Sequence, residues 1–320
     1  MIELTVGIPV FNGEHYIEEA LHSIANQTRR PDRVVVFDNC STDRTRALVR
    51  TFPGLPIELI CNQRNIGLFG NHNRCLALAP ETEYLHIMHA DDKLLPPFYD
   101  RMIHSLRNYP PISLAWAQAQ WIGAKGESLR PIVPVHGRGA HHILLNDFLK
   151  QRARLRADIY ISGALIRTGR QPMNCHFPED YQMTGDHIFW ALLATQCRQL
   201  VSVSEIQLCY RRHAQGGTCR NYQSSETFLV EDLRAIQTIE NILNITPVER
   251  WVRQNLALCF FAALVWVKRD IVQETDPVIA DRVLKDGRRL VPLLHWMTGS
   301  LAFFLRKIRR SFSNKDGPRK

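Results

Sequence analysis

Residues 4–118 alternate between short apolar runs and segments with helical periodicity, and this alternation limits the possible folds more than any other feature. The apolar runs, rich in β-branched residues, are residues 4–10, 33–38, 57–61, 84–88 and 112–118. Between them, apolar side chains recur every three or four positions at residues 16–24, 76–79 and 99–106. Strands that alternate with helices in this way predict an α/β fold, in which a mostly parallel central sheet is covered by helices on both faces.

The remainder of the chain divides into a mixed section and a helical section. Residues 141–150 and 186–195 have helical patterns, whereas residues 159–167 and 205–212 have the composition of strands. From residue 224 to the end the pattern is helical. We therefore expect an α/β domain over residues 1–220 and a helical C-terminal region over residues 221–320.

Composition narrows the class of protein. Hydrophobic residues make up 45% of the chain and charged residues 22%, which excludes general disorder. The eight cysteines include no C-x-x-C pair, so they indicate neither a zinc site nor a disulfide framework, and we expect a reducing, cytoplasmic setting. The opening residues MIELTVGIPV resemble a strand and not an export signal.

The net charge of +9 is concentrated at the C-terminus. Residues 288–320 have a net charge of +8, whereas residues 1–287 have a net charge of only +1. Proteins that bind nucleic acid usually spread basic residues over a docking face together with stacking aromatic residues. We therefore expect no nucleic-acid partner, and the basic tail needs another explanation.

Polar residues follow the predicted strands at the points where ligands collect in parallel sheets, beyond the carboxyl ends of the strands. Pro9 has no N–H donor and belongs at the end of the first strand. Asp38 ends the second strand, just before a good helix start at residues 41–43. Its carboxylate can accept a hydrogen bond from a nucleobase or a ribose, or it can simply satisfy its own turn.

Asp91 and Asp92 directly follow the fourth strand. Two adjacent carboxylates at the end of a buried strand are costly unless a positive charge lies beside them. One of them alone would suffice to cap the following turn. The pair suits Mg²⁺ or Mn²⁺, which prefer carboxylate oxygens and commonly share their coordination shell with substrate phosphates.

Taken in order, these segments resemble the family 2 glycosyltransferases with the GT-A fold. The resemblance covers roughly residues 3–215 and rests on IPVFNGE, VVVFDNCSTD, NQRNIGLFGNHN, HADD, ISGALI, GD and YRRH. It implies a Rossmann-like nucleotide-binding half and an inverting transfer of a sugar from a nucleotide-sugar donor. A UDP-sugar is the donor we expect, and the acceptor would be a hydroxyl of a glycan or lipid-linked molecule in cell-surface polysaccharide or lipopolysaccharide synthesis.

The resemblance also implies roles for individual residues. Asp92 matches the aspartate that binds Mg²⁺ or Mn²⁺, and Asp91 matches its neighbour facing the ribose. His213 matches a histidine that closes over the donor as a metal ligand or phosphate contact. Asp38 matches the aspartate that contacts the base, and His89 stands where many relatives have another acid.

Further residues match the donor cleft of the family: Pro9, Phe11, Glu14, Asn65, Gly67 and Gly163. Cys40 occupies a position where relatives commonly have glycine. Because glycine is the residue that adopts a positive φ without strain, the cysteine predicts a backbone at this position that does not need one.

Transfer needs a base that removes the proton of the acceptor hydroxyl. Two acids compete for this role by resemblance, Asp180 and Asp186. Asp186 leads directly into the helical pattern of residues 186–195 and is the residue we choose. Gly185 stands where relatives usually have Glu.

Two alternatives to this enzyme deserve comparison. A dinucleotide-dependent oxidoreductase would need a G-x-G-x-x-G turn after the first strand, and PVFNGEHYI does not supply one. A catalytically inactive nucleotide- or glycan-binding module of the same fold is the second alternative, since Cys40, His89 and Gly185 all depart from the family pattern.

The apolar runs near the C-terminus, residues 256–267 and 290–305, are shorter than the ~20 residues that span a bilayer. They either pack as helices on the catalytic domain or lie in the plane of a membrane. The basic segment RKIRRSF at residues 306–312 favours anionic lipid. We expect peripheral association with the inner face of the cell membrane.

Overall fold

The computed structural model describes residues 3–131, 139–155, 159–213, 216, 225–243, 245–273 and 277–313. The chain forms two compact units. The first contains residues 1–148 and 157–216, and the second contains residues 149–156 and 217–320. Residues 149–156, which lie inside the α/β domain expected from the sequence, thus group with the helical unit.

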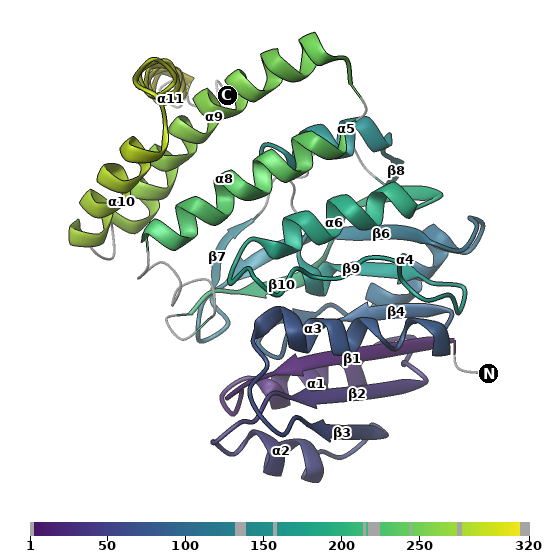
Figure 1. The fold of residues 1–320 in the computed structure, drawn as a ribbon. Coiled ribbons are helices and arrows are strands. Elements are labelled where there is room, and N and C mark those ends of the chain that lie inside the picture. Colours follow the sequence, from purple (N-terminus) through teal and green to yellow (C-terminus); the bar gives the residue numbers. More distant parts are fainter. Residues whose placement is uncertain are drawn as a thin grey trace, which may run out of the picture. The chain divides into compact units, whose positions relative to one another are not determined.

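A single mixed sheet forms the centre of the first unit (Figure 1). Its strands are β1 (Leu4–Val10), β2 (Arg33–Asp38), β3 (Ile57–Cys61), β4 (Tyr84–Ile87), β5 (Lys93–Leu94), β6 (Ser113–Ile122), β7 (Ser128–Pro131), β8 (Ala140–His142), β9 (Ala164–Arg167) and β10 (Gln199–Arg211). The main order is β3-β2-β1-β4-β9-β6-β10-β5, with β7 beside β6 and β8 beside β10.

The long strands run mainly in one direction, as predicted. Strands β3, β2, β1 and β4 are parallel neighbours, and β6 is parallel to β10. Inside the main order, β9 is antiparallel to both β4 and β6, and the short strands β5, β7 and β8 are antiparallel to their neighbours as well. The carboxyl ends of β1, β2 and β3 therefore meet at one edge, where the polar residues identified in the sequence lie.

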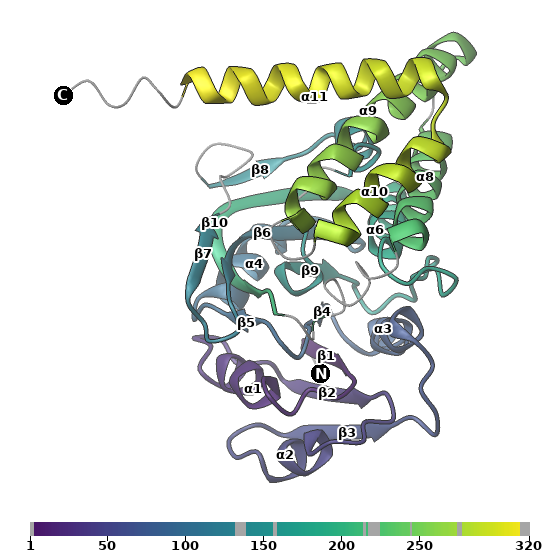
Figure 2. The same ribbon diagram turned by 90° about the vertical axis from the view of Figure 1, so that its left-hand side faces the viewer.

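Helices cover both faces of this sheet. They are α1 (Ile17–Ala25), α2 (Thr45–Thr51), α3 (Leu68–Leu76), α4 (Phe98–Leu106), α5 (Leu145–Arg152) and α6 (Gly185–Gln196), with short 3-10 turns η1 (Ala79–Glu81) and η2 (Ile161–Gly163). Figure 2 shows α1 and α4 on one side of the sheet and α3 and α6 on the other. This arrangement follows from the parallel strand order, because each crossover places a helix against one face.

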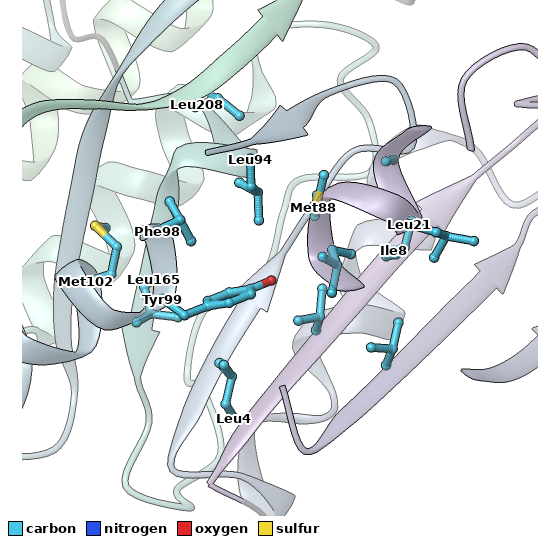
Figure 3. Packing of buried hydrophobic residues seen from close by; sticks show 14 of the residues in the cluster. Leu4, Ile8, Leu21, Met88, Leu94, Phe98, Tyr99, Met102, Leu165 and Leu208 are labelled. Carbon is cyan, nitrogen blue, oxygen red and sulfur yellow. The ribbon is translucent and has the colours of Figure 1, made fainter. Parts of the chain in front are cut away.

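The hydrophobic core fixes the strands whose ends carry the polar residues. All seven residues of β1 are buried. Figure 3 shows Leu4 and Ile8 of β1 in one cluster with Leu21 of α1 and with Phe98 and Tyr99 of α4. Burying an aliphatic or aromatic side chain of this size contributes about 1.5–3 kcal/mol, so the centre of the sheet is a stable base for the loops at its edge.

Four elements differ from the ranges that periodicity predicted. The third helix begins at Leu68, earlier than expected, because Gly67 turns the chain with a φ of 82° directly before it. The strands β6 and β10 are longer than predicted. The expected strand 159–167 begins with the turn η2 and becomes extended only at Ala164.

The second unit is helical, in agreement with the prediction for the C-terminal region. Its main helices are α8 (Ser225–Ile242), α9 (Pro247–Gln273), α10 (Pro277–Leu290) and α11 (Leu293–Ser313). Glycines permit close crossing: a Cβ on Gly299 of α11 would lie 2.0 Å from the carbonyl oxygen of Cys259 in α9. In the part of the chain that the structure describes, no helix is both long enough and apolar enough to cross a bilayer.

Candidate functional site

Hydrogen bonds join the loops that follow β1, β2 and β3 into one surface. The amide N–H of Asn12 donates to Ser41 Oγ at 2.9 Å, and the amide N–H of Thr42 donates back to Asn12 Oδ1 at 2.9 Å. On the other side, Asn39 Nδ2 donates to Asn65 Oδ1 at 2.9 Å. Short polar side chains hold the loops in this way because they can satisfy backbone groups that the sheet no longer pairs.

Asp38, at the end of β2, has one carboxylate oxygen bonded and one bare. Its side chain is fully buried. Oδ2 accepts hydrogen bonds from the amide of Ser41 at 3.1 Å and from Nε of Arg46 at 2.6 Å. Oδ1 is also buried, yet no donor among the described residues reaches it. Since a buried acceptor without a partner is costly, Oδ1 is poised to accept a hydrogen bond from a bound molecule.

Cys40 corrects one of the predictions from the sequence. Its φ is 67°, in the left-handed region, so the backbone does adopt the conformation that the missing glycine would favour. The reason lies in its neighbours, which are fixed on both sides. The Asn39 side chain bonds Asn65 and the Gly67 carbonyl, and the amide of Ser41 bonds Asp38. A residue with a Cβ pays about 1–2 kcal/mol for such a φ.

Asp92 lies buried behind the turn that follows β4. Ser162 Oγ donates to Asp92 Oδ2, and the amide N–H of Arg211 donates to Oδ1 at 2.9 Å. Burial raises the pKa of Asp92 well above its usual value, and the negative charge of Asp91 raises it further. A buried carboxylate in this setting is stable in its charged form only when a further positive charge binds beside it.

Asp91 is the more accessible of the two acids and lies beside His213. Nε2 of His213 is 3.0 Å from Asp91 Oδ2, so residues 122 positions apart in the sequence meet where β10 ends. Burial alone would raise the pKa of Asp91, but the hydrogen bond from His213 opposes this effect, and the pKa lies below its usual value.

The structure brings His89 to the same two acids. Nδ1 of His89 is 3.8 Å from Asp92 Oδ2. One donor atom from each of His89, Asp91 and Asp92 lies within 4.8 Å of the others, which is close enough for all three to contact one divalent cation.

Arg211 holds the acidic turn and was not identified from the sequence. Its buried guanidinium donates to the carbonyls of Asp91 and Gly123, at 2.8 and 3.1 Å, and pairs with Glu19 of α1. It also stacks 4.7 Å above the centre of the Tyr16 ring. Its position beside His213 in YRRH was the only signal in the sequence, since nothing local predicts contacts with residues so far along the chain.

The candidate base Asp186 lies in the first turn of α6. It is half-buried, and its Oδ1 accepts the N–H of His187 at 2.9 Å. The competing acid, Asp180, is exposed in the loop before the helix.

Gly185 has a packing role at the start of the same helix. A Cβ on it would lie 2.6 Å from the ring of Phe69, in the first turn of α3. The absence of a side chain thus allows the N-termini of α3 and α6 to lie together.

The remaining predicted residues lie along the same edge. Pro9 is buried in β1, opposite Phe37 of β2, whereas Phe11 is 43% exposed. Glu14 accepts the amide N–H of Arg44 at 3.1 Å and so supports the start of α2. Gly163 is buried; a Cβ there would lie 3.4 Å from the carbonyl oxygen of Ala117, which is an ordinary contact.

Comparisons with known proteins agree with this fold. The model of the family described as "Glycosyl transferase family 2" matches residues 5–155. An uncharacterized protein of Mycobacterium tuberculosis is 32% identical over 114 residues, which are 36% of this chain and 35% of that protein. The succinoglycan biosynthesis protein ExoO of Rhizobium meliloti is 24% identical over 59% of this chain and 55% of its own length.

Among solved structures, the chain is similar to Staphylococcus aureus TarS in complex with UDP-GlcNAc. The TM-score is 0.64 and the identity 18%, over 93% of this chain and 84% of that chain, which shows a common fold. This chain spans about a third of the M. tuberculosis relative and about half of ExoO. Residues 5–155 thus match glycosyl transferase family 2, and the similarity to TarS shows a common fold over 93% of the chain.

Proposed function

We propose that the chain transfers a sugar from a UDP-sugar to a hydroxyl of a glycan or lipid-linked acceptor, with the help of a divalent cation and with inversion at the anomeric carbon. The observation that carries the proposal is the meeting of Asp91, Asp92 and His213 at the carboxyl edge of the sheet, with Oδ1 of Asp38 buried and without a donor at the end of β2. Relatives such as ExoO support a role in cell-surface polysaccharide synthesis.

The donor nucleotide would bind over the loops after β1, β2 and β3. Asp38 Oδ1 would accept the N–H of the base, which gives the buried oxygen its missing partner. The similarity to a structure that holds UDP-GlcNAc supports a uracil base. The cleft residues that we propose beside Asp38 and Asp91 are Pro9, Phe11, Glu14, Asn65, Gly67 and Gly163.

The donor set at the acidic turn fits Mg²⁺ or Mn²⁺. Asp92 would serve as a ligand by exchanging its bond from Ser162 for the cation, and its raised pKa supports this because the buried charge needs a positive partner. Asp91 and His213 lie beside it with more accessible atoms. Bound there, the cation would neutralise charge that develops on the departing nucleoside diphosphate.

Asp186 would act as the base. The acceptor oxygen forms a bond to the anomeric carbon while the bond from that carbon to the diphosphate oxygen breaks, and the hydroxyl proton passes to the Asp186 carboxylate. A single displacement of this kind inverts the anomeric centre. The half-buried place of Asp186 at a helix start favours it over the exposed Asp180.

Thermal shift with UDP-, GDP- and dTDP-sugars, each with and without Mn²⁺, tests the donor. We expect the largest shift with a UDP-sugar and Mn²⁺, loss of the metal-dependent part in Asp92→Ala, and loss of donor binding in Asp38→Ala. Asp186→Asn should retain donor binding while losing transfer, and Asp180→Asn serves as its matched control. If the wild-type chain binds the donor but neither transfers nor hydrolyses it with any acceptor preparation, the inactive binding module is the better account.

We also propose that the helical unit contacts the inner face of the cell membrane. In α11, four apolar side chains are 57–75% exposed: Leu293, Leu294, Met297 and Leu301. Leu294, Met297 and Leu301 are spaced by three and four residues and therefore lie on one face of the helix. A second exposed apolar set lies on α9: Val248, Trp251, Val252, Leu256 and Val267. Four basic residues at 306–310 follow the α11 stripe, which matches anionic headgroups beside an apolar layer. The seven cysteines that the structure describes are free thiols, and a cytoplasmic location is part of this proposal.

Sedimentation with vesicles tests this surface. We expect binding to vesicles that contain phosphatidylglycerol, weaker binding to pure phosphatidylcholine, and loss of binding in Leu294→Glu/Met297→Glu. Val283→Ile, a conservative change at a buried site in α10, is the control. Equal binding by the double variant, or a dimer that the double variant dissociates, would assign the apolar face to something other than lipid.

A further inference from the structure

His89 and His72 form a hydrogen-bonded pair behind the acidic turn. Their Nε2 atoms are 3.0 Å apart, and Nδ1 of His72 is 2.7 Å from the carbonyl oxygen of Leu68. A carbonyl oxygen only accepts, so Nδ1 of His72 carries a proton and donates it. In neutral His72, Nε2 is then the acceptor, and His89 must donate from its own Nε2.

This series of hydrogen bonds determines which nitrogen of His89 has no proton. With the proton on Nε2, Nδ1 of neutral His89 keeps its lone pair. Nδ1 is the atom that lies 3.8 Å from Asp92 Oδ2, in the group that also contains Asp91. The pair therefore presents an unprotonated imidazole nitrogen to the two carboxylates.

The surroundings hold both rings in place and keep His72 in the neutral form. His72 is buried, with its ring centre 5.2 Å from that of Phe177 and 6.0 Å from that of Phe69. The backbone N–H of His89 donates to Ser162 Oγ at 2.9 Å. Because His72 is buried among these aromatic rings, a charged imidazolium is disfavoured there, which leaves its Nε2 as the acceptor for His89.

We propose that His89 binds the cation through Nδ1, beside Asp91 and Asp92, and that His72 is the positioning residue that sets its tautomer. The inference rests on the proposed function, which supplies the cation. Histidine residues that bind metals commonly donate a hydrogen bond from the second ring nitrogen to a fixed acceptor, and here that acceptor is another histidine. A nitrogen in place of a carboxylate favours Mn²⁺ or later transition ions over Mg²⁺.

Pulsed EPR of bound Mn²⁺ with UDP tests the nitrogen directly, because a coordinated imidazole gives ¹⁴N modulation. His213 can also supply a nitrogen, so the decisive background is His213→Gln. We expect ¹⁴N modulation to persist in His213→Gln and to vanish when His89→Gln is added. His104→Gln, at an exposed site on α4, is the control and should leave the signal unchanged.

Two further variants test the tautomer and the ion preference. His72→Gln keeps an acceptor for His89 Nε2 and should retain Mn²⁺ affinity, whereas His72→Leu removes the acceptor and should weaken it about tenfold. His89→Asp should shift the ratio of Mg²⁺ to Mn²⁺ affinity toward Mg²⁺. Circular dichroism of each variant, with melting as in the wild type, shows that the fold is intact.

The outcomes separate the two proposals. Mn²⁺ that binds with UDP but shows no modulation dependent on His89 overturns the role of His89 and leaves the cation site standing. No Mn²⁺ binding with or without UDP overturns both. Equal affinities in His72→Gln and His72→Leu overturn the positioning role of His72.

Discussion

Gly185→Ala is expected to destabilise the fold, although alanine normally stabilises a helix. The ideal Cβ at this position lies 2.6 Å from Phe69 Cε2 and 3.0 Å from two further ring carbons. The ring cannot easily retreat, because it stacks on Phe177 at 5.7 Å and Phe177 stacks on Phe189 at 3.8 Å. Inserting a methyl into such packing costs about 1–3 kcal/mol, against a gain of at most about 0.5–1 kcal/mol from replacing a glycine at the first position of a helix.

The net expectation is a loss of about 0.5–2 kcal/mol in the free energy of unfolding. The reasoning makes a sharper prediction in a double-mutant cycle. Phe69→Ala alone should cost about 3 kcal/mol or more. In that background the ring is gone, so Gly185→Ala should become stabilising by about 0.5–1 kcal/mol, which is a change of sign.

Urea denaturation followed by intrinsic fluorescence measures each corner of the cycle. Gly70→Ala is the matched control: it also lies in a helix, but its Cβ would approach Ile66 no closer than 3.4 Å, and it should stabilise in both backgrounds. If Gly185→Ala stabilises the wild-type chain, or if its effect is the same with and without the Phe69 ring, the steric account of this glycine is refuted.

Three further predictions concern other parts of the chain. Cys40→Gly should raise the free energy of unfolding by about 0.5–1 kcal/mol, because glycine adopts the positive φ without the strain that a Cβ causes. Cys40→Ala should give no such gain, and an equal gain in both variants would implicate the thiol instead. Burial lowers the pKa of His86 to about 4, so the unfolded chain binds more protons between that value and 6.5, and stability falls as pH falls through this window. Between pH 7 and pH 5 the wild-type chain should therefore lose about 2 kcal/mol more than His86→Gln, and parallel pH profiles of the urea midpoint would contradict this. In the helical unit, Arg253→Met should cost about 3 kcal/mol because the buried Glu240 carboxylate loses the ion pair and the two hydrogen bonds that Arg253 provides, and Arg253→Met/Glu240→Leu should recover most of the loss; no recovery in thermal melts would show that packing and not charge is responsible.

Local patterns in the sequence were sufficient for the first four strands of the sheet and for the motifs at its edge. Apolar runs of strand length separated by helical periodicity predicted β1 to β4, because a strand that is buried on both faces of a parallel sheet consists of consecutive apolar residues. The same patterns located Asp38, Asp91 and Asp92, since a carboxylate at the end of a buried strand is visible in one short segment. Helix starts were less well predicted: α3 begins at Leu68 because of the turn at Gly67.

Only the tertiary structure decided which distant residues meet and in what chemical state. The pairing of Asp91 with His213, the contacts of Arg211, and the His72–His89 pair join segments that share no local pattern. The sequence led to the wrong expectation for Cys40, because its positive φ is imposed by hydrogen bonds from neighbouring loops. The pKa of each buried group likewise depends on its spatial neighbours. The sequence by itself determined the strands and the acids at their ends, because burial patterns are local, whereas folding alone determined their partners, because hydrogen bonds and desolvation act through space.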